Sequence, residues 1–253
     1  MEKVGEQRQN YYGSLCTEMY EILHAEAPRD ELAFYLSFAG KGEKILEPLC
    51  GSGRFLVPFL KRGFDISGVD LSEEMLEKLK QKAPAAKVVQ ADILEFAPQE
   101  KFHYIFITSG SMSLFTDIDL CKEILCKLKD LLLPGGRLVF AVDTIATRCT
   151  DDSTYKEAIS VKTKEGFDLI LKSKNHYDEQ SQTQFSPGIY ELYNGTELLQ
   201  SEAMDFQTHL YRFGEMQQYL QEVGFREITT YTSFSKEIAL DDRGEMFLFV
   251  CRC

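Results

Sequence analysis

The sequence predicts an α/β protein in which a parallel sheet is followed, late in the chain, by an antiparallel β segment. Short apolar runs alternate with amphipathic helical stretches over about one hundred residues, the pattern of a parallel sheet with helical crossovers. The first apolar run leads into a glycine-containing turn and a helix. Residues 157–210 instead alternate apolar and polar residues, which is typical of antiparallel strands.

Residues 9–39 form a helical segment that is broken at Pro28. Leu15, Met19 and Leu23 have helical spacing before the break, and apolar residues resume it afterwards. We expect two short helices here.

Five strands and three helices follow in alternation. The predicted strands are Lys44–Glu47, Asp65–Asp70, Lys87–Gln90, Tyr104–Thr108 and Arg137–Val142, and the predicted helices are Arg54–Lys61, Glu73–Lys82 and Ile118–Leu132. Ser72 and Asp117 can cap the second and third helices, and Pro134-Gly135-Gly136 should end the third. Pro58 should kink the first helix or remove one of its backbone hydrogen bonds. This order implies right-handed crossovers between parallel strands.

After residue 147 the prediction changes to an inserted antiparallel sheet. Asn194-Gly195 predicts a two-residue hairpin turn of type I′. The chain then returns to a helix at Gly214–Val223 and strands at Glu227–Thr232 and Glu245–Cys251. We predict one domain in four parts: a helical lid (1–40), a cofactor-binding core (41–147), an antiparallel β cap (148–212) and a return helix with a final hairpin (213–253).

The most informative motif runs from Lys44 to Phe55, where a strand ends on Glu47 and a turn with Gly51 and Gly53 enters a helix. Such a unit usually binds a nucleotide-type cofactor at the carboxyl edge of a parallel sheet. The dinucleotide fingerprint requires a third glycine where this chain has Leu56. A carboxylate at Glu47 suits a cofactor with an ammonium and a sulfonium better than a pyrophosphate. These residues favour S-adenosylmethionine.

Five segments in order resemble the class I S-adenosylmethionine-dependent methyltransferases of the small-molecule type. They are Glu47–Gly53, Val69–Ser72, Gln90–Ile93, Phe102–Phe106 with its end Thr108–Ser111, and Leu132–Leu138. His103 stands where the family commonly has aspartate. The resemblance implies a Rossmann-like, doubly wound, seven-stranded, mostly parallel sheet with a reversed last strand and an inserted antiparallel β cap.

The resemblance also implies which residues contact the cofactor. Leu49 stands where the family commonly has glycine, so its backbone contact is expected to need a negative φ. The methionine end would lie on Glu47, Leu49, Cys50, Gly51 and Gly53, the ribose on Asp70, the adenine on Leu71, Met75, Asp92 and Ile93, and the transferred methyl above Ser109.

Methyl transfer from a sulfonium rests mainly on proximity and orientation, so the sequence fixes no catalytic residue. Tyr11, Tyr12 and Tyr20 are candidates for aromatic walls around the sulfonium and the acceptor, or for packing residues. His176 and His209 are candidate bases or ordinary surface and packing histidines. Tyr211, beside Arg212, and Tyr12 complete the list of catalytic candidates.

Composition limits the partners. A net charge of −12, without a dense basic cluster, argues against a nucleic-acid partner.

We expect no membrane span and no signal peptide. Seven cysteines, without the spacing of a disulfide scaffold, indicate reduced thiols and a cytoplasmic protein. No metal site is expected, and the protein is predicted to be a monomer or homodimer.

The leading hypothesis is methyl transfer to a nitrogen or oxygen atom of a small molecule. The first alternative is a non-catalytic protein that binds S-adenosylmethionine in a regulatory role. A nicotinamide-dependent oxidoreductase is opposed by Leu56 and Glu47. A protein or RNA methyltransferase would need a basic face that the sequence does not reveal.

Overall fold

The computed structural model describes residues 9–253, which divide into two compact units. The parallel unit contains residues 26–147 and 209–253. The antiparallel unit contains residues 9–25 and 148–208. The predicted N-terminal helical segment is therefore shared, with its first helix in the antiparallel unit and its second in the parallel unit.

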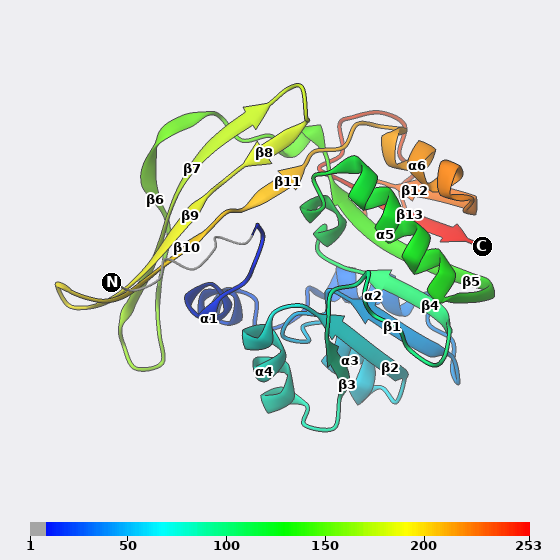
Figure 1. Ribbon diagram of the computed structural model, residues 1–253, viewed down its shortest axis with the longest axis horizontal. Coiled ribbons are helices and arrows are strands. Elements are labelled where there is room, and N and C mark those ends of the chain that lie inside the picture. The colour runs from blue at the N-terminus through cyan, green and yellow to red at the C-terminus, as the bar shows by residue number, and fades with distance from the viewer. Residues whose placement is uncertain (1–8) are drawn as a thin grey trace. The chain divides into compact units, whose positions relative to one another are not determined.

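The parallel unit contains a seven-stranded sheet in the order β12-β13-β5-β4-β1-β2-β3 (Figure 1). Strand β13 is antiparallel to β5 and β12, and the other paired strands run parallel. The strands are β1 Lys44–Pro48, β2 Asp65–Asp70, β3 Lys87–Gln90, β4 Phe102–Ile107, β5 Leu132–Asp143, β12 Arg226–Tyr231 and β13 Met246–Arg252. The predicted seven-stranded sheet with a reversed last strand is confirmed.

Helices cover both faces of this sheet because its central strands are apolar on both sides. Along β5, Leu138 and Phe140 pack with helices α5 and α6, whereas Val139 and Ala141 pack on the opposite face with α2, α3 and α4. The helices are α2 Arg29–Leu36, α3 Leu56–Lys61, α4 Glu73–Lys82, α5 Ile118–Leu131 and α6 Glu215–Val223, with short 3-10 turns η1 Ser111–Leu114 and η2 Ile145–Thr147.

Local signals explain where these helices begin. The Met75 N–H donates to Ser72 Oγ at 3.1 Å, and the Asp117 side chain likewise accepts from the first turn of α5. Pro58 lies in the first turn of α3, which begins at Leu56. The Val57 N–H donates to the Gly53 carbonyl and the Phe59 N–H to the Phe55 carbonyl, so Pro58, which has no N–H, leaves out the backbone hydrogen bond between these two. Helix α5 ends before Pro134 because the chain already enters β5 at Leu132.

The antiparallel unit is built on a six-stranded sheet, which confirms the predicted antiparallel insertion. Five strands follow the order β10-β9-β7-β8-β11, and β6 pairs with β7. The elements are α1 Ser14–Leu23, β6 Asp152–Lys162, β7 Asp168–Asp178, β8 Thr183–Phe185, β9 Gly188–Asn194, β10 Glu197–Met204 and β11 Gln207–His209. The β9–β10 loop is Gly195-Thr196, one residue later than predicted. In this loop only Gly195 has a positive φ, of 61°, as a type II′ turn requires.

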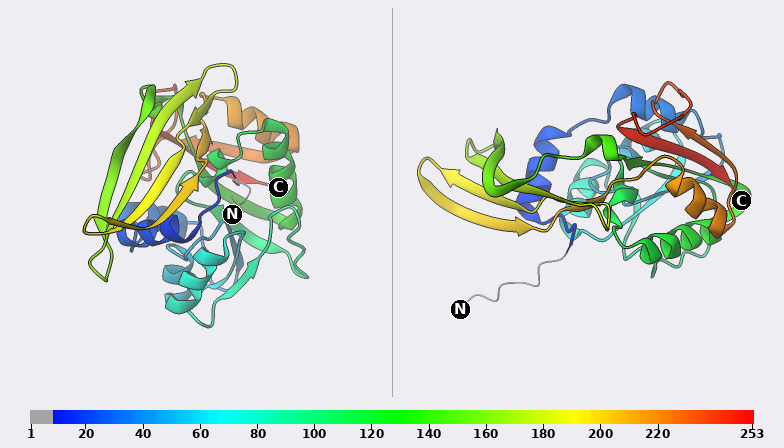
Figure 2. Two further views of the ribbon diagram at one scale, coloured as in Figure 1. Left: turned by 60° about the vertical axis from the view of Figure 1, so that its left-hand side comes forward. Right: turned by 90° about the horizontal axis from the view of Figure 1, so that it is seen from above.

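Helix α1 packs against this sheet, beside β9 and β10 in both views of Figure 2. Cys16 and Met19 of α1 form one apolar cluster with Tyr190 and Met204 of the sheet. The Glu202 carboxylate accepts from the first backbone N–H groups of α1, at 3.0 and 3.1 Å. A strand residue therefore caps this helix, whose own N-cap, Gly13, has no side chain for the purpose.

Candidate functional site

The carboxyl edge of the parallel sheet holds the predicted cofactor residues. Glu47 lies in β1, Asp70 ends β2, Ser109 follows β4, and Asp143 ends β5. Strand β1 lies between β2 and β4, so the strand order reverses direction there. In doubly wound sheets ligands bind in the crevice at such a switch point.

The glycine loop between β1 and α3 is tied to the end of β2. The Gly51 N–H donates to Asp70 Oδ2 at 2.7 Å, and the Cys50 N–H donates to the Val69 carbonyl at 3.2 Å. Gly53 has a φ of 81°, and a Cβ there would lie 2.8 Å from Leu79 Cγ of α4. Glycine is required at position 53 by both its conformation and the close approach of α4.

Leu49 has a φ of 55°, so the negative φ on which its backbone contact with the cofactor was expected to depend is not found. The chain turns sharply here because Cys50 is already bonded to β2. A left-handed conformation at a residue with a Cβ costs roughly 1–2 kcal/mol. Leu49 packs its partly buried side chain against the apolar cluster on the α5 face, which offsets part of that cost. The chain thus keeps the conformation that glycine would provide.

Glu47 is a buried carboxylate with an incomplete set of partners. Its side chain is 2% exposed, and Oε2 has no hydrogen-bond partner among the described residues. Burial raises the pKa of Glu47 well above its usual value, and the charges of Asp70 and Glu31 raise it further. An orphaned buried carboxylate oxygen requires an explanation, and a bound cation supplies one.

Asp70 fixes two turns at once. In addition to the Gly51 bond, its Oδ1 accepts from the Ser72 N–H at 2.9 Å at the start of α4. Burial raises the pKa of Asp70 although these backbone hydrogen bonds oppose the shift. Each carboxylate oxygen has further lone pairs, so hydroxyl donors can still bind it.

The loop after β4 is held by a residue that sequence reasoning missed. Ser109 has a φ of 56° and Gly110 a φ of 69°, and the Ser109 N–H donates to Glu31 Oε1 of α2 at 3.0 Å. Glu31 is buried, and that burial raises its pKa. The sequence feature that could have indicated this role of Glu31 was its carboxylate on the same helix as the core residues Phe34 and Tyr35.

These groups give the edge a concentrated negative character. Burial raises the pKa of Asp143 to about 6, as it raises those of Glu31, Glu47 and Asp70. No ion pair found within residues 9–253 involves any of these four carboxylates. A polyanionic pyrophosphate would be repelled here, whereas a cationic ligand would be attracted.

The residues predicted to contact adenine surround the ends of β2 and β3. Leu71 is 45% exposed, whereas Met75 and Ile93 are buried. Asp92 is exposed, and its Oδ1 accepts from the Leu94 N–H at 2.8 Å, which shapes its own turn. Cys50 is buried beside Gly68. The large exposed apolar side chain at Leu71 is available for a ligand to cover.

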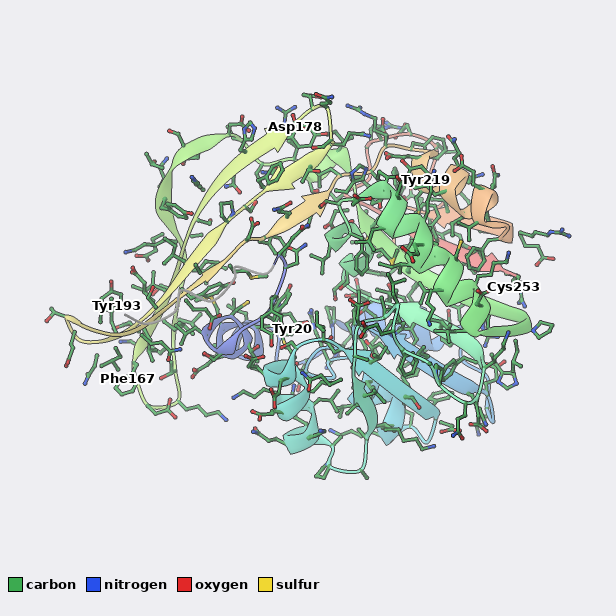
Figure 3. The ribbon with its side chains drawn as sticks, viewed as in Figure 1. Tyr20, Phe167, Asp178, Tyr193, Tyr219 and Cys253 are labelled. Atoms are coloured by element: carbon green, nitrogen blue, oxygen red, sulfur yellow. The ribbon has the colours of Figure 1, made fainter. Side chains whose placement is uncertain are left out.

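The aromatic candidates lie in the antiparallel unit. Tyr12 and Tyr20 line a pocket of about 280 Å³, together with Met19, Tyr190 and Met204. The Tyr12 and Tyr20 rings meet edge to face at 6.1 Å, and Figure 3 labels Tyr20 on α1. Tyr11 precedes α1 and is not among the residues lining this pocket.

Of the other three catalytic candidates, His176 lies in the antiparallel unit, and His209 and Tyr211 lie in the parallel unit, where the Tyr211 N–H donates to the Asp143 carbonyl at 3.0 Å. His176 is exposed on β7, with Nδ1 3.2 Å from Asp151 Oδ2. His209 is buried, and its Nε2 lies 2.8 Å from Glu215 Oε1. Tyr211 is fully buried, with its hydroxyl 3.5 Å from Cys121 Sγ. Nothing in these contacts tests a catalytic role, and each role remains a prediction.

Comparison with known proteins agrees with this architecture. Residues 45–136 match the model of a family described as a methyltransferase domain. A protein of Geobacillus sp. (strain WCH70) that carries the name of a methyltransferase is 26% identical over 92% of this chain and 96% of its own length. The matching family segment contains the glycine loop, Asp70 and the loop after β4.

Two solved structures share the fold at low sequence identity. An S-adenosylmethionine-dependent methyltransferase from Clostridium acetobutylicum ATCC 824 has a TM-score of 0.76 at 14% identity, covering 92% of this chain and 96% of that one. The sugar N-methyltransferase KedS8 from Streptoalloteichus sp. ATCC 53650 has a TM-score of 0.73 at 20% identity, covering 97% and 96%.

The sheet order and the glycine-loop edge define a class I methyltransferase fold. With the family match over residues 45–136, the protein is an S-adenosylmethionine-dependent methyltransferase. No helix within the described residues is long and apolar enough to cross a membrane.

Proposed function

We propose that this protein transfers the methyl group of S-adenosylmethionine to a nitrogen or oxygen atom of a small molecule. The observation that carries the proposal is the orphaned Oε2 of buried Glu47, at an edge where Asp70 and Glu31 add negative charge. A ligand with an ammonium and a sulfonium compensates that charge, whereas a dinucleotide would increase it.

The proposed roles follow the positions of the residues along this edge. Glu47 and loop residues 49–53 hold the methionine part, with backbone groups of the loop and the Glu47 carboxylate as partners. Asp70 accepts from the ribose hydroxyls while it holds Gly51 and Ser72 in place. Leu71, Met75, Asp92 and Ile93 surround the adenine, and Ser109 lies at the reacting end.

The chain contributes mainly orientation to the reaction. The cofactor supplies an electrophilic methyl group on a positively charged sulfur, so the leaving group needs no proton. The hydrogen bonds from the Gly51 N–H to Asp70 and from the Ser109 N–H to Glu31 hold two loops of the carboxyl edge in place. A site that is already ordered loses little entropy on binding, and holding the reactants in line is itself a large rate effect.

The pocket of the antiparallel unit supports a small-molecule acceptor. About 280 Å³ accommodates one apolar group of modest size, and the aromatic and methionine side chains of the lining offer it an apolar surface. We propose that this pocket binds an apolar group of a small molecule. The fold shared with a sugar N-methyltransferase supports the same class of acceptor. Cytoplasmic location and a monomeric or homodimeric state remain predictions.

Calorimetric titration with S-adenosylmethionine, S-adenosylhomocysteine and NAD tests the cofactor assignment. We expect micromolar binding of the first two, no binding of NAD, and loss of binding in Asp70→Ala. Asp65→Ala is the matched control, because Asp65 begins the same strand and its carboxylate pairs with Lys87 at 2.8 Å. A folded wild-type protein that binds neither methyl-cofactor form would overturn the proposal.

A second measurement separates the enzyme from a non-catalytic binder. Transfer of tritium from S-adenosyl-[methyl-³H]methionine to a panel of amines and alcohols would support the enzyme. Tight cofactor binding without transfer to any acceptor would instead favour a regulatory binding protein.

A further inference from the structure

Asp143 is an acidic residue at the carboxyl edge to which the proposed function gives no role. It ends β5, next to the end of β4. Its backbone is held on both sides: the Asp143 N–H donates to Ser113 Oγ at 2.8 Å, and the Tyr211 N–H donates to the Asp143 carbonyl at 3.0 Å. The position of the residue is therefore well fixed.

The Asp143 carboxylate lies directly against the loop that follows β4. A Cβ built on Gly110 would lie only 2.7 Å from Asp143 Oδ1, so glycine at position 110 leaves room for this carboxylate. Gly110 follows Ser109, which Glu31 holds by its backbone N–H. Asp143 thus lies next to the loop to which we assign the reacting end of the site.

The carboxylate has no protein partner to account for its burial. Within residues 9–253 no hydrogen bond or ion pair to its oxygens is found. Burial is the only cause of its raised pKa, of about 6, and no other titratable group contributes to that shift. Asp143 is half-buried, so its carboxylate oxygens, without a protein partner among the described residues, are still open to water or a ligand. A carboxylate at the carboxyl edge whose pKa is raised towards neutral pH is typical of a functional group.

We propose that the acceptor is an amine, that Asp143 binds it, and that Asp143 takes a proton from the reacting nitrogen of the amine. This inference rests on the proposed function. The ammonium form of the amine pairs with the carboxylate. One proton moves from nitrogen to an Asp143 oxygen, which becomes a neutral acid. The freed lone pair of nitrogen forms the new N–CH3 bond while the C–S bond breaks, and its electrons stay on the departing sulfur. Asp143 then returns its proton to water.

The charges of the carboxyl edge favour an amine over a hydroxyl acceptor. The carboxylates of Glu31, Glu47 and Asp70 make this edge attractive to a cation. A carboxylate is also far too weak a base to ionise an alcohol, whereas it can accept a proton from nitrogen.

The first test needs no acceptor. Carbon-13 NMR of the aspartate carboxyl groups would follow their titration in wild type and Asp143→Asn, both saturated with S-adenosylhomocysteine. We expect one aspartate carboxyl that titrates near pH 6 in wild type and is missing from the variant. An Asp143 carboxyl that titrates near pH 4 would overturn the inference.

The second test measures tritium transfer to glucosamine, 3-amino-3-deoxyglucose, phenethylamine and tyramine, with glucose and phenethyl alcohol as hydroxyl counterparts. We expect transfer to an amine, an acid limb near pH 6, and about a 100-fold lower kcat/KM without that limb in Asp143→Asn. Asp65→Asn, at the opposite end of the sheet, should match wild type.

The remaining outcomes also decide the question. Transfer to the alcohols alone, transfer to none of the amines, or an unchanged pH profile in Asp143→Asn would each overturn the inference. In all of these cases wild type and variant should bind S-adenosylhomocysteine equally. Failure of wild type to bind it would instead refute the proposed function itself.

Discussion

Replacing Glu47 with glutamine should change stability and cofactor affinity in opposite directions. Glu47→Gln keeps the shape of the side chain and removes a charge that is buried, has one oxygen without a partner, and lies near Asp70 and Glu31. In the empty protein that charge is destabilising. When a cationic cofactor binds, the same charge becomes favourable, so its removal should weaken binding.

The magnitudes follow from the burial of Glu47 and its unpartnered oxygen. A buried polar group without a partner costs about 1–3 kcal/mol, so we expect Glu47→Gln to raise the unfolding free energy at pH 8 by an amount of that order. This is a Tm increase of about 2–4 °C per kcal/mol for a chain of this size. Loss of a hydrogen bond to a charged group should cost about 1.5–3 kcal/mol of binding, or roughly 10- to 150-fold in Kd.

The raised pKa of Glu47 sets how the difference in unfolding free energy between Glu47→Gln and wild type changes with pH. Because the pKa of Glu47 is raised in the folded state, its favourable contribution is complete below the unfolded pKa, near 4.5, and is lost as the pH rises through the folded value. The advantage of Glu47→Gln should therefore be absent at pH 4 and grow towards pH 8.

Thermal unfolding of the empty protein between pH 4 and pH 8, and calorimetry with S-adenosylmethionine at pH 8, would measure both effects. Glu77→Gln, an exposed change on α4, is the matched control and should alter neither quantity. If Glu47→Gln unfolds at a lower temperature than wild type at pH 8, or binds the cofactor as tightly, the reasoning about Glu47 is refuted.

Substitutions at three further positions test other parts of the site and its support. Leu49→Val should lower the unfolding free energy by about 1–2 kcal/mol, because a β-branched residue is poorly suited to a φ of 55°. Leu49→Asn should be the more stable of the two in urea unfolding, and the reverse order would contradict the backbone argument. Gly53→Ala should cost at least about 2 kcal/mol in the same assay, since its Cβ would meet Leu79 Cγ at 2.8 Å in a left-handed conformation; a neutral effect would show that α4 moves freely. Burial raises the pKa of Glu215, but hydrogen bonds from His209 and Arg212 outweigh it, and the pKa is lowered overall. Its stabilising contribution is therefore present above about pH 4.5 and lost as the pH falls through the folded value. Glu215→Gln should flatten the stability profile of the protein in that acidic range, as followed by thermal unfolding, and an unchanged profile would contradict this assignment.

The sequence predicted those features of the fold that depend on local signals. Strand β2 at Asp65–Asp70 and helix α4 at Glu73–Lys82 have the predicted bounds, because the apolar period and the Ser72 cap are contained in those segments. The order of strands followed from the alternation and from the family resemblance. The hairpin at Gly195 was displaced by one residue because β9 continues through Asn194.

The parts of the site that were missed depend on contacts between distant segments. Glu31 lies 78 residues before Ser109, whose N–H it accepts, and Asp143 gains its role only where β5 ends beside Gly110. Neither relation has a sequence period or a spacing that could reveal it. The positive φ of Leu49 also follows from the bond between Cys50 and β2 rather than from residue type.

The antiparallel unit is discontinuous in the chain, because α1 and strands β6–β10 come from segments separated by more than a hundred residues of the parallel unit. Glu202 of β10 caps α1, and Met204 packs against Cys16. A chimera intended to replace the antiparallel unit must therefore exchange residues 9–25 and 148–208 together. Exchange of either segment alone would separate a helix from its cap. During evolution the two segments are likewise expected to vary as one unit, so that a change in one is compensated by a change in the other.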